Sequence, residues 1–349
     1  MLGMSRSVPD RPVPPDADLR LKPLEITADC QRVNGHERYR LVTRSDFDGL
    51  VSAVLLRHLD MIDDILFAHP KDVQDGVTEI TDRDIITNLP YAAQARLVFD
   101  HHHSELLRAG TVAKNHIIDV WAPSAARVVH RHYGGAWAFP SVSEEVMSAV
   151  DRADSADFEL DDILYPTDWA LLSFIMDSRT GLGRFRDFRI SNYQLMMRLI
   201  DLVFEQVPVE KILADPDVAE RVDLFRRQHA AAAEQLRQVA SVRGDVVVLD
   251  FRAVPEIHAC NRFLVYALFP DLQVSVHVLP GKQGANTVIA AGKSIIDRQS
   301  NADIGRLMLG YGGGGHRNAG TCQVAHGGVS RVLDEIVDAL NEPARLRYG

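Results

Sequence analysis

Residues 97–103 of the chain read Leu-Val-Phe-Asp-His-His-His, an apolar run that ends in one aspartate and three histidines. The apolar part is typical of a buried β-strand, so Asp100, His101 and His102 follow at its carboxyl end. A buried carboxylate needs a partner, and carboxylate and imidazole groups are ligands of divalent cations. Because open α/β sheets bind ligands beyond the carboxyl ends of their strands, this run predicts a metal site at that edge.

The composition narrows the class of protein. The chain has 349 residues, a hydrophobic content of 46%, a charged content of 25% and a formal net charge of −10. These are globular values, and the acidic balance argues against indiscriminate binding to long nucleic acid duplexes. Three cysteines without Cys-x-x-Cys spacing indicate neither a disulfide framework nor a structural zinc site. Without a membrane-length apolar run or a secretory pattern, we expect a cytoplasmic protein with no membrane partner.

The pattern of apolar residues predicts two domains. Residues 1–36 are rich in Pro, Asp and Arg and are expected to form a disordered or loosely docked arm. Within residues 37–190, strands alternate with helices, which indicates a doubly wound, mainly parallel α/β sheet. Residues 191–243 predict a helical connector, and residues 244–349 predict a smaller α/β domain. Strands are expected at Tyr39–Thr43, Ile65–Ala68, Leu97–Phe99, His116–Ile118, Val246–Phe251, Gln273–Val278 and Asn286–Ala291.

A second acidic motif follows the first predicted strand. Asp46-Phe47-Asp48-Gly49 lies in the loop after Tyr39–Thr43. Two carboxylates two residues apart can face one cation, and Gly49 permits a sharp entry into the next helix. The alternative is a simple turn in which an aspartate caps that helix.

A third carboxylate is expected between these two motifs. Residues 79–84 read Glu-Ile-Thr-Asp-Arg-Asp. A site with two metal ions needs a bridging carboxylate, for which Asp82 is the best placed and Asp84 the alternative. The other interpretation of this segment is a charged surface turn.

Further aspartates end predicted helices. Asp177 follows an apolar helical stretch, where an anion is unfavourable unless a cation, a metal ion or an arginine compensates it. Asp151 and Asp154 raise the same question. Ion pairs with Arg152 or Arg127 are the simpler explanation for these two.

A glycine-rich motif lies near the C-terminus. Residues 312–320 read Gly-Gly-Gly-Gly-His-Arg-Asn-Ala-Gly. Bare backbone N–H groups can approach an anion closely, and His316 and Arg317 add charged donors, which favours phosphate binding. The alternative is a flexible linker, but a linker would not continue into His-Arg-Asn before an apparent strand.

Taken in order, these motifs resemble those of the DHH phosphoesterase superfamily with its DHH-associated C-terminal domain (DHHA1). The resemblance extends from about Tyr39 to the C-terminus. The superfamily includes single-strand exonucleases, oligoribonucleases that also act on nucleoside bisphosphates, and hydrolases of cyclic-dinucleotide products. Related enzymes that share only the first domain cleave pyrophosphate or polyphosphate.

The resemblance implies a site for one or two cations, usually Mn²⁺, with Mg²⁺ as the alternative. The implied metal ligands are Asp46, Asp48, Asp82, His101 and Asp177. The implied catalytic residues are Asp100, which would orient the histidines, and His102, which would lie near the scissile phosphate. The implied substrate-binding residues are Gly313, Gly314, Gly315, His316, Arg317 and, by a looser match, Arg262.

The chain departs from the family at Val42. Many members carry a histidine ligand at this position, four residues before the first aspartate of the first motif. Valine cannot coordinate a metal ion. The first cation is therefore expected to bind weakly, to use another ligand or to be absent.

The leading functional hypothesis is a metal-dependent phosphoesterase. We expect it to hydrolyse a phosphodiester, phosphomonoester or phosphoanhydride of a small nucleotide or a short single-stranded oligonucleotide, in a cleft between the domains. Exopolyphosphatase is the alternative activity. A hypothesis of another class is a non-catalytic nucleotide- or phosphate-binding module with a degenerate metal site, and a purely structural set of ion pairs is the third. Assembly as a homodimer is left open.

Overall fold

The computed structural model describes residues 37–102, residue 105 and residues 112–342. The predicted arm at residues 1–36 lies outside the described residues. From Arg38 onward, the described residues belong to one compact unit, which contains two sheets and a helical segment between them in chain order. The predicted α/β class is thus confirmed, while the exact boundaries of the two domains stay a prediction.

The first sheet is parallel throughout its described strands. These are β1 (Tyr39–Thr43), β2 (Ile62–Phe67), β3 (Asp84–Thr87), β4 (Leu97–Asp100) and β5 (His116–Ile118), which pair in the order β2-β1-β3-β4-β5. A parallel sheet is buried on both faces, so its apolar side chains alternate between two clusters. Leu41, Ile85 and Phe99 enter one cluster, and Val42, Ile86 and Val98 enter the other.

The strand β3 was not among the predicted strands. Its four residues, Asp-Ile-Ile-Thr, are all buried between β1 and β4. The run is too short to show a period, and its first residue is an aspartate, so the segment resembles a charged turn in the sequence. This omission has a direct consequence for the predicted metal ligands, because β3 begins at Asp84.

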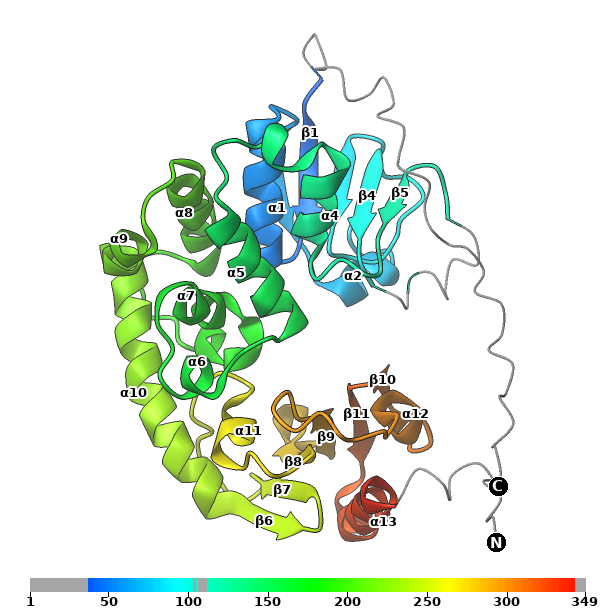
Figure 1. Cartoon of the computed structure of the whole chain (residues 1–349). Helices are drawn as coiled ribbons and strands as arrows, with labels where there is room; N and C mark the ends of the chain where they lie inside the picture. The colour runs from blue at the N-terminus through cyan, green and yellow to red at the C-terminus, as the bar shows by residue number, and fades with distance from the viewer. Residues whose placement is uncertain (1–36, 103–104, 106–111, 343–349) are drawn as a thin grey trace, which may run out of the picture. The chain divides into compact units, whose positions relative to one another are not determined.

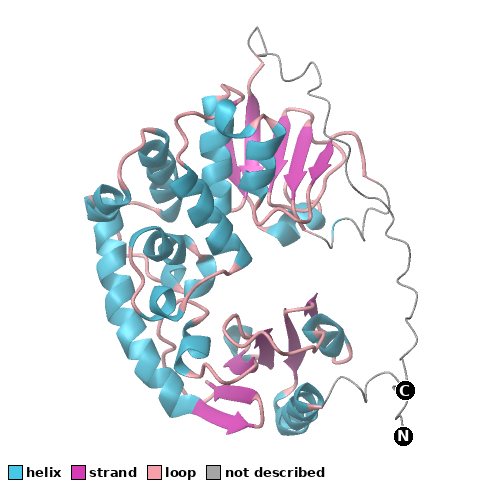
Figure 2. Ribbon diagram, in the orientation of Figure 1, coloured by secondary structure: helices cyan, strands magenta, loops and turns pink. Residues whose placement is uncertain are grey.

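Helices pack on the sheet and continue beyond it (Figures 1 and 2). The helix α1 (Phe47–His58) is buried along most of its length and packs against α4 (Ala125–His132), α5 (Glu144–Ser155) and α8 (Asn192–Phe204). The other helices in the described residues up to 239 include α2 (Pro70–Gln74), α6 (Leu160–Leu164), α7 (Asp168–Met176), α9 (Val209–Ala214) and α10 (Pro216–Val239), with 3₁₀ turns η2 (Gly135–Trp137), η3 (Ser178–Thr180) and η4 (Leu182–Arg184).

The long helix α10 leads directly into the second sheet, whose first strand takes up residues 240–243 at the end of the predicted connector (Figure 1). The strands of this second sheet are β6 (Ala240–Arg243), β7 (Val246–Asp250), β8 (Val274–Pro280), β9 (Thr287–Lys293), β10 (Gly314–His316) and β11 (Ala319–Val324). They pair in the order β10-β11-β9-β8-β7-β6. Only β7 and β8 pair in parallel among them. The accompanying helices are α11 (Leu264–Leu268), α12 (Ile304–Leu309) and α13 (Val329–Asn341), with η5 (Lys282–Gly284) and η6 (His326–Gly328).

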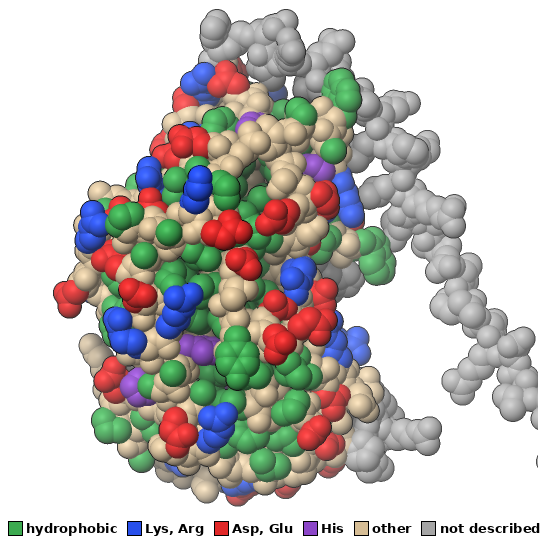
Figure 3. All heavy atoms as spheres, turned by 60° about the vertical axis from the view of Figure 1, so that its left-hand side comes forward, with side chains coloured by type: hydrophobic (Ala, Val, Ile, Leu, Met, Phe, Trp, Pro, Cys, Tyr) green, Lys and Arg blue, Asp and Glu red, His purple; other side chains and the backbone are tan. Residues whose placement is uncertain are grey.

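The surface carries charges of both signs. On the face drawn in Figure 3, acidic and basic side chains are interspersed with apolar ones. No helix in the described part of the chain combines the length and the apolar character that crossing a bilayer requires.

Candidate metal and phosphate site

The carboxyl edge of the first sheet carries both predicted motifs. Asp46 follows β1 and caps α1, where its Oδ1 accepts a hydrogen bond from Gly49 N at 3.0 Å. The Cα of Gly49 leaves no room for a side chain, because a Cβ there would lie 2.0 Å from the carbonyl oxygen of Arg44. The helix-capping interpretation therefore holds for Asp46, while the other aspartate turns inward and the metal-binding role of the motif stays a prediction.

Asp48 is that inward residue. Its side chain is 2% exposed, and its two oxygens accept hydrogen bonds from Ala125 N at 3.0 Å and Ala126 N at 2.7 Å. These N–H groups begin α4, where the backbone favours a negative charge. Burial nevertheless raises the pKa of Asp48 to about 7, and the nearby charge of Asp154 adds to this effect.

His101 is oriented as a metal ligand would be. Its Nδ1 lies 3.2 Å from the carbonyl oxygen of Ala122, so Nδ1–H can donate there, and Nε2 would be the ligand atom for a cation that displaces its proton. Nε2 lies 3.0 Å from Asp154 Oδ2 as an ion pair, without hydrogen-bond geometry. Burial acts to lower the pKa of His101, but the Asp154 carboxylate outweighs it and raises that pKa to about 9.

Asp154 is the residue that the predicted ligand set omitted. It lies in the last turn of α5, where a carboxylate is unfavourable without a cation. Burial acts to raise the pKa of Asp154, but the contact with His101 lowers it on balance. Its neighbour Asp151 follows the simpler explanation, since it binds Arg127 and Ser124. The helix-terminus signal was present for Asp154 in the sequence, although the sequence could not show which of the two aspartates faces the sheet.

Asp48, His101 and Asp154 form one cluster. Each contributes one ligand atom, and all three atoms lie within 4.8 Å of one another. The buried carboxylate of Asp48 and the half-buried carboxylate of Asp154 repel each other at this separation, and this repulsion adds to burial in raising the pKa of Asp48. A divalent cation would relieve this repulsion, since carboxylate oxygens are donors for Mn²⁺ and Mg²⁺ and imidazole nitrogen is a donor for first-row transition metals. The donor set therefore fits the cation that the family resemblance implies.

Asp100 holds the second histidine. It is fully buried, and its Oδ1 accepts hydrogen bonds from His101 N at 2.8 Å and His102 N at 3.2 Å. The same oxygen lies 2.7 Å from His102 Nδ1, which fixes the imidazole so that Nε2 faces away from the carboxylate. The His102 side chain is 36% exposed. The expected orienting geometry of Asp100 is present, and its catalytic consequence stays a prediction.

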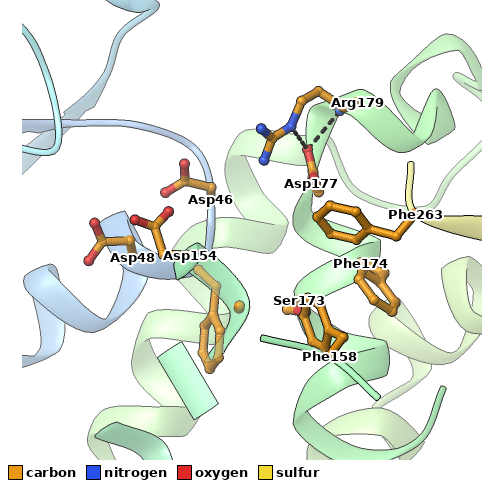
Figure 4. Close-up of a pocket in the computed structure, with 11 residues that line it drawn as sticks. Asp46, Asp48, Asp154, Phe158, Ser173, Phe174, Asp177, Arg179 and Phe263 are labelled. Carbon is orange, nitrogen blue, oxygen red and sulfur yellow. Dashed lines mark hydrogen bonds and ion pairs between the residues drawn. The ribbon is translucent and has the colours of Figure 1, made fainter. Parts of the chain in front are cut away.

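Asp177 lies in the same pocket as Asp46, Asp48 and Asp154 but is paired differently (Figure 4). Its Oδ1 accepts hydrogen bonds from Arg179 N at 2.9 Å and Arg179 Nε at 2.7 Å. Burial acts to raise the pKa of Asp177, but Arg179 outweighs it and lowers that pKa. The arginine compensation considered for this helix end is therefore present.

Arg262 reaches the same carboxylate from the second half of the chain. Its Nε lies 3.5 Å from Asp177 Oδ2, and its guanidinium lies 4.2 Å from the centre of the Phe263 ring. Burial, followed by the charge of Arg179, lowers the pKa of Arg262 to about 10. The guanidinium groups of Arg179 and Arg262 thus lie beside the acidic cluster, which is the arrangement an anionic substrate would need.

The structure does not bring Asp82 to the site. It is exposed in the turn before β3, at the amino end of the strand, whereas the cluster lies at the carboxyl edge of the sheet. The alternative, Asp84, is buried in a bidentate pair with Arg40, at 2.7 and 2.9 Å, and also accepts a hydrogen bond from Thr81 N. Both expectations about the bridging carboxylate are corrected by the position of β3.

Asn88 occupies the place at the carboxyl end of β3. It is 1% exposed, has a φ of 55°, and lies one residue beyond the Thr87–Phe99 pair, as Asp100 does. Neither Oδ1 nor Nδ2 of its amide makes a hydrogen bond among the described residues. A buried amide without such a partner is costly, which indicates a ligand or solvent partner at this edge. Val42, by contrast, is fully buried in an apolar cluster on β1.

The glycine-rich motif forms a hairpin at the edge of the second sheet. Gly314, Gly315 and His316 make up β10, which pairs with β11. A Cβ at Gly313 would lie 2.0 Å from the carbonyl oxygen of Thr321, so strand packing alone requires that glycine. His316 and Arg317 are exposed. The linker alternative is wrong, and the phosphate-binding role of Gly313, Gly314, Gly315, His316 and Arg317 stays a prediction.

A parallel five-stranded sheet with an Asp–His cluster at its carboxyl edge, followed by a six-stranded mixed sheet, is consistent with the fold of DHH phosphoesterases. A solved structure of the pGpG-specific phosphodiesterase PggH from Vibrio cholerae is 53% identical to this chain, covers 87% of it and 99% of its own length, and has a TM-score of 0.78. The DHH domain of a protein described as a member of a family of ribosomal proteins covers 88% of this chain and 87% of its own length, with 12% identity and a TM-score of 0.51, a likeness of fold alone. No family model and no curated protein matches the sequence. The identity to PggH shows that the chain belongs to the DHH phosphoesterase family.

Proposed function

We propose that this protein is a metal-dependent phosphodiesterase that hydrolyses a 5′-phosphorylated dinucleotide such as pGpG. The observation that carries the proposal is the Asp48–His101–Asp154 cluster, in a chain 53% identical to a pGpG-specific phosphodiesterase. Water is added across the phosphodiester: the P–O bond to the 3′-oxygen breaks, that oxygen takes a proton, and two molecules of GMP result.

The cation, Mn²⁺ with Mg²⁺ as the alternative, would be held by Asp48, His101 and Asp154. Asp46 lines the same pocket and would be a further carboxylate ligand. Asn88 is our proposal for the neutral ligand at the position where a bridging carboxylate was expected. When bound, the cation supplies positive charge to the phosphoryl oxygens and lowers the pKa of water.

The remaining side chains act on the substrate. His102, fixed by Asp100, presents Nε2 at the exposed side of the edge and can donate a proton or a hydrogen bond to a phosphate oxygen. Arg179 lines the same pocket and Arg262 contacts Asp177, so both guanidinium groups are already ordered by that carboxylate. Ordered cations cost less entropy when an anion binds, so this pair would neutralise the phosphate effectively.

Other features stay proposals of the same kind. The hairpin at Gly313, Gly314 and Gly315, with His316 and Arg317, would bind the distal part of the substrate. Residues 37–190 and 244–349 would be the two domains. Cytoplasmic location and homodimer formation are predictions. Light scattering after size-exclusion chromatography tests whether the protein forms a homodimer.

The test uses the purified full-length protein with Mn²⁺ and, in parallel, pGpG, cyclic di-GMP, a five-nucleotide RNA and polyphosphate. We expect pGpG to yield two equivalents of GMP and EDTA to abolish the reaction. His102→Ala should abolish turnover without loss of stability, while Asp82→Asn, a matched control at the other edge of the sheet, should leave turnover unchanged.

Other outcomes contradict the proposal in distinct ways. Phosphate release from polyphosphate alone would identify an exopolyphosphatase. Absence of both hydrolysis and Mn²⁺ uptake, with nucleotide binding retained, would identify a non-catalytic binding module.

A further inference from the structure

Trp121 is a large apolar side chain that the fold leaves in solvent. Its side chain is 90% exposed, in the segment between β5 and α4. Tryptophan is on average a highly buried residue, and its ring has a strong tendency to contact other flat groups. Such exposure is therefore informative when it occurs beside a binding site.

The segment that carries Trp121 also contacts the Asp48–His101–Asp154 cluster. Residues 119–126 contribute the carbonyl oxygen of Ala122, 3.2 Å from His101 Nδ1, and the two N–H groups that donate to Asp48. Trp121 directly precedes Ala122, so its Cα lies about 3.8 Å from that of a residue in direct contact with a cluster imidazole. Two of the three cluster residues are thus positioned by the same short segment that presents the exposed indole.

The backbone of Trp121 is held in place although its ring is exposed. Asp119 Oδ1 accepts a hydrogen bond from Trp121 N at 3.0 Å, and Asp119 Oδ2 pairs with Arg131 at 3.0 Å. The backbone of Asp119 is joined to the end of β4 through its N–H, which donates to the carbonyl oxygen of Asp100 at 3.1 Å. A ring on such a braced turn is a pre-organised surface, since little backbone entropy is lost when a ligand covers it.

We propose that Trp121 is the nucleobase platform of this enzyme: it stacks on a base of the nucleotide whose phosphate lies at the Asp48–His101–Asp154 cluster. The proposal rests on the proposed function. In a nucleotide the base and the phosphate are attached to one sugar, so a phosphate at the cluster places a base near its rim. Every base has a flat π-face, and stacking on an aromatic side chain contributes about tenfold or more to binding.

The chain offers a matched control. Trp137 is 89% exposed, but it lies in η2, beyond the far end of α4 from the cluster. Removal of either indole uncovers no core, so both variants are expected to fold. Trp121→Ala, Trp121→Phe and Trp137→Ala form the series.

The first experiment measures KM and kcat for pGpG and for the same dinucleotide backbone without its bases. We expect Trp121→Ala to raise KM for pGpG about tenfold with kcat changed less than about threefold, and Trp121→Phe to restore most of the affinity. The base-free analogue should be hydrolysed equally by wild type and variant. Trp137→Ala should match wild type. An unchanged KM in Trp121→Ala would overturn the proposal, as would a variant that changes only the oligomeric state.

The second experiment does not depend on catalysis. GMP and ribose 5-phosphate are titrated into protein loaded with Mg²⁺, so that the cation offsets the Asp48 and Asp154 carboxylates, while tryptophan fluorescence is followed. GMP should quench wild type and Trp137→Ala but not Trp121→Phe, and ribose 5-phosphate should quench none. If wild type hydrolyses no dinucleotide yet shows this Trp121-dependent quenching, the proposed function fails and the platform stands. If pGpG is hydrolysed and the quenching is independent of Trp121, the platform fails and the function stands.

Discussion

Asp154 provides the sharpest test of the site, because the predicted ligand set omitted it. Asp154→Asn keeps the size of the side chain and removes its charge. In the wild-type protein burial acts to lower the pKa of His101, and Asp154 outweighs it and raises that pKa to about 9. Compared with the ordinary pKa of about 6.5, this shift contributes about 3 kcal/mol to the free energy of unfolding when His101 is protonated, at about 1.36 kcal/mol for each tenfold change in proton affinity.

The sign of the pH dependence follows from the direction of the shift. The folded-state pKa of His101 lies above its value in the unfolded chain, so the metal-free protein has the full stabilisation below about pH 6.5. The stabilisation is lost as the pH rises through about 9. We therefore expect EDTA-treated wild type to lose about 3 kcal/mol of unfolding free energy between about pH 6.5 and 9.5, relative to Asp154→Asn.

Two measurements check this prediction. Urea denaturation of EDTA-treated protein across that pH range gives the free energies, and calorimetric titration at about pH 7.5 gives the Mn²⁺ affinity. Even residues that only orient a ligand contribute about 10- to 100-fold to metal affinity, so loss of a ligand should cost about 100-fold or more. Asp157→Asn is the control, since Asp157 is exposed three residues further along. Wild-type Mn²⁺ affinity in Asp154→Asn would refute the assignment, and parallel pH profiles would refute the electrostatic reasoning.

Three further predictions concern the same sheet and the candidate metal site. Asp84→Asn should destabilise the fold by about 1–3 kcal/mol in urea denaturation, because it removes the buried carboxylate that accepts hydrogen bonds from Arg40 and Thr81, yet keep wild-type Mn²⁺ affinity; a loss of affinity would return Asp84 to the site. Asn88→Gly keeps the left-handed backbone and removes the amide, so Mn²⁺ affinity should fall about tenfold in a calorimetric titration, and equal affinity would mean that the amide binds only solvent. Removal of metal by EDTA should lower the melting temperature, and Mn²⁺ at about 100 times its Kd should restore about 2.7 kcal/mol; identical melting curves would leave only structural ion pairs.

Much of the site was predictable because its parts are local in sequence. Asp46 and Asp48 follow a strand and start a helix within a few residues, and the Asp100–His102 geometry is formed almost entirely within that tripeptide. An apolar strand followed by such residues has few conformations available, so the position of these side chains at the sheet edge follows from the pattern alone.

The predictions about the site that were wrong depended on contacts between residues far apart in the sequence and on one short strand, β3. β3 has four residues and begins with an aspartate, so the chain does not reveal that Asp82 and Asp84 lie at its amino end while Asn88 follows it. A strand of that length carries too little periodicity to be recognised in the sequence. When a strand is missed, residues that precede it can be assigned to the carboxyl edge of the sheet although they lie at the amino edge.

The sequence by itself determined the class of fold, the family resemblance and the two motifs that lie beside each other at strand ends. Only the tertiary structure decided which helix-terminal aspartate completes the cluster. Asp154 faces His101 at 3.0 Å, whereas Asp177 is neutralised by Arg179. Both aspartates end helices and satisfy the same local rule. What distinguishes them is the charge that the rest of the chain brings to each helix terminus, and a local pattern carries no information about that.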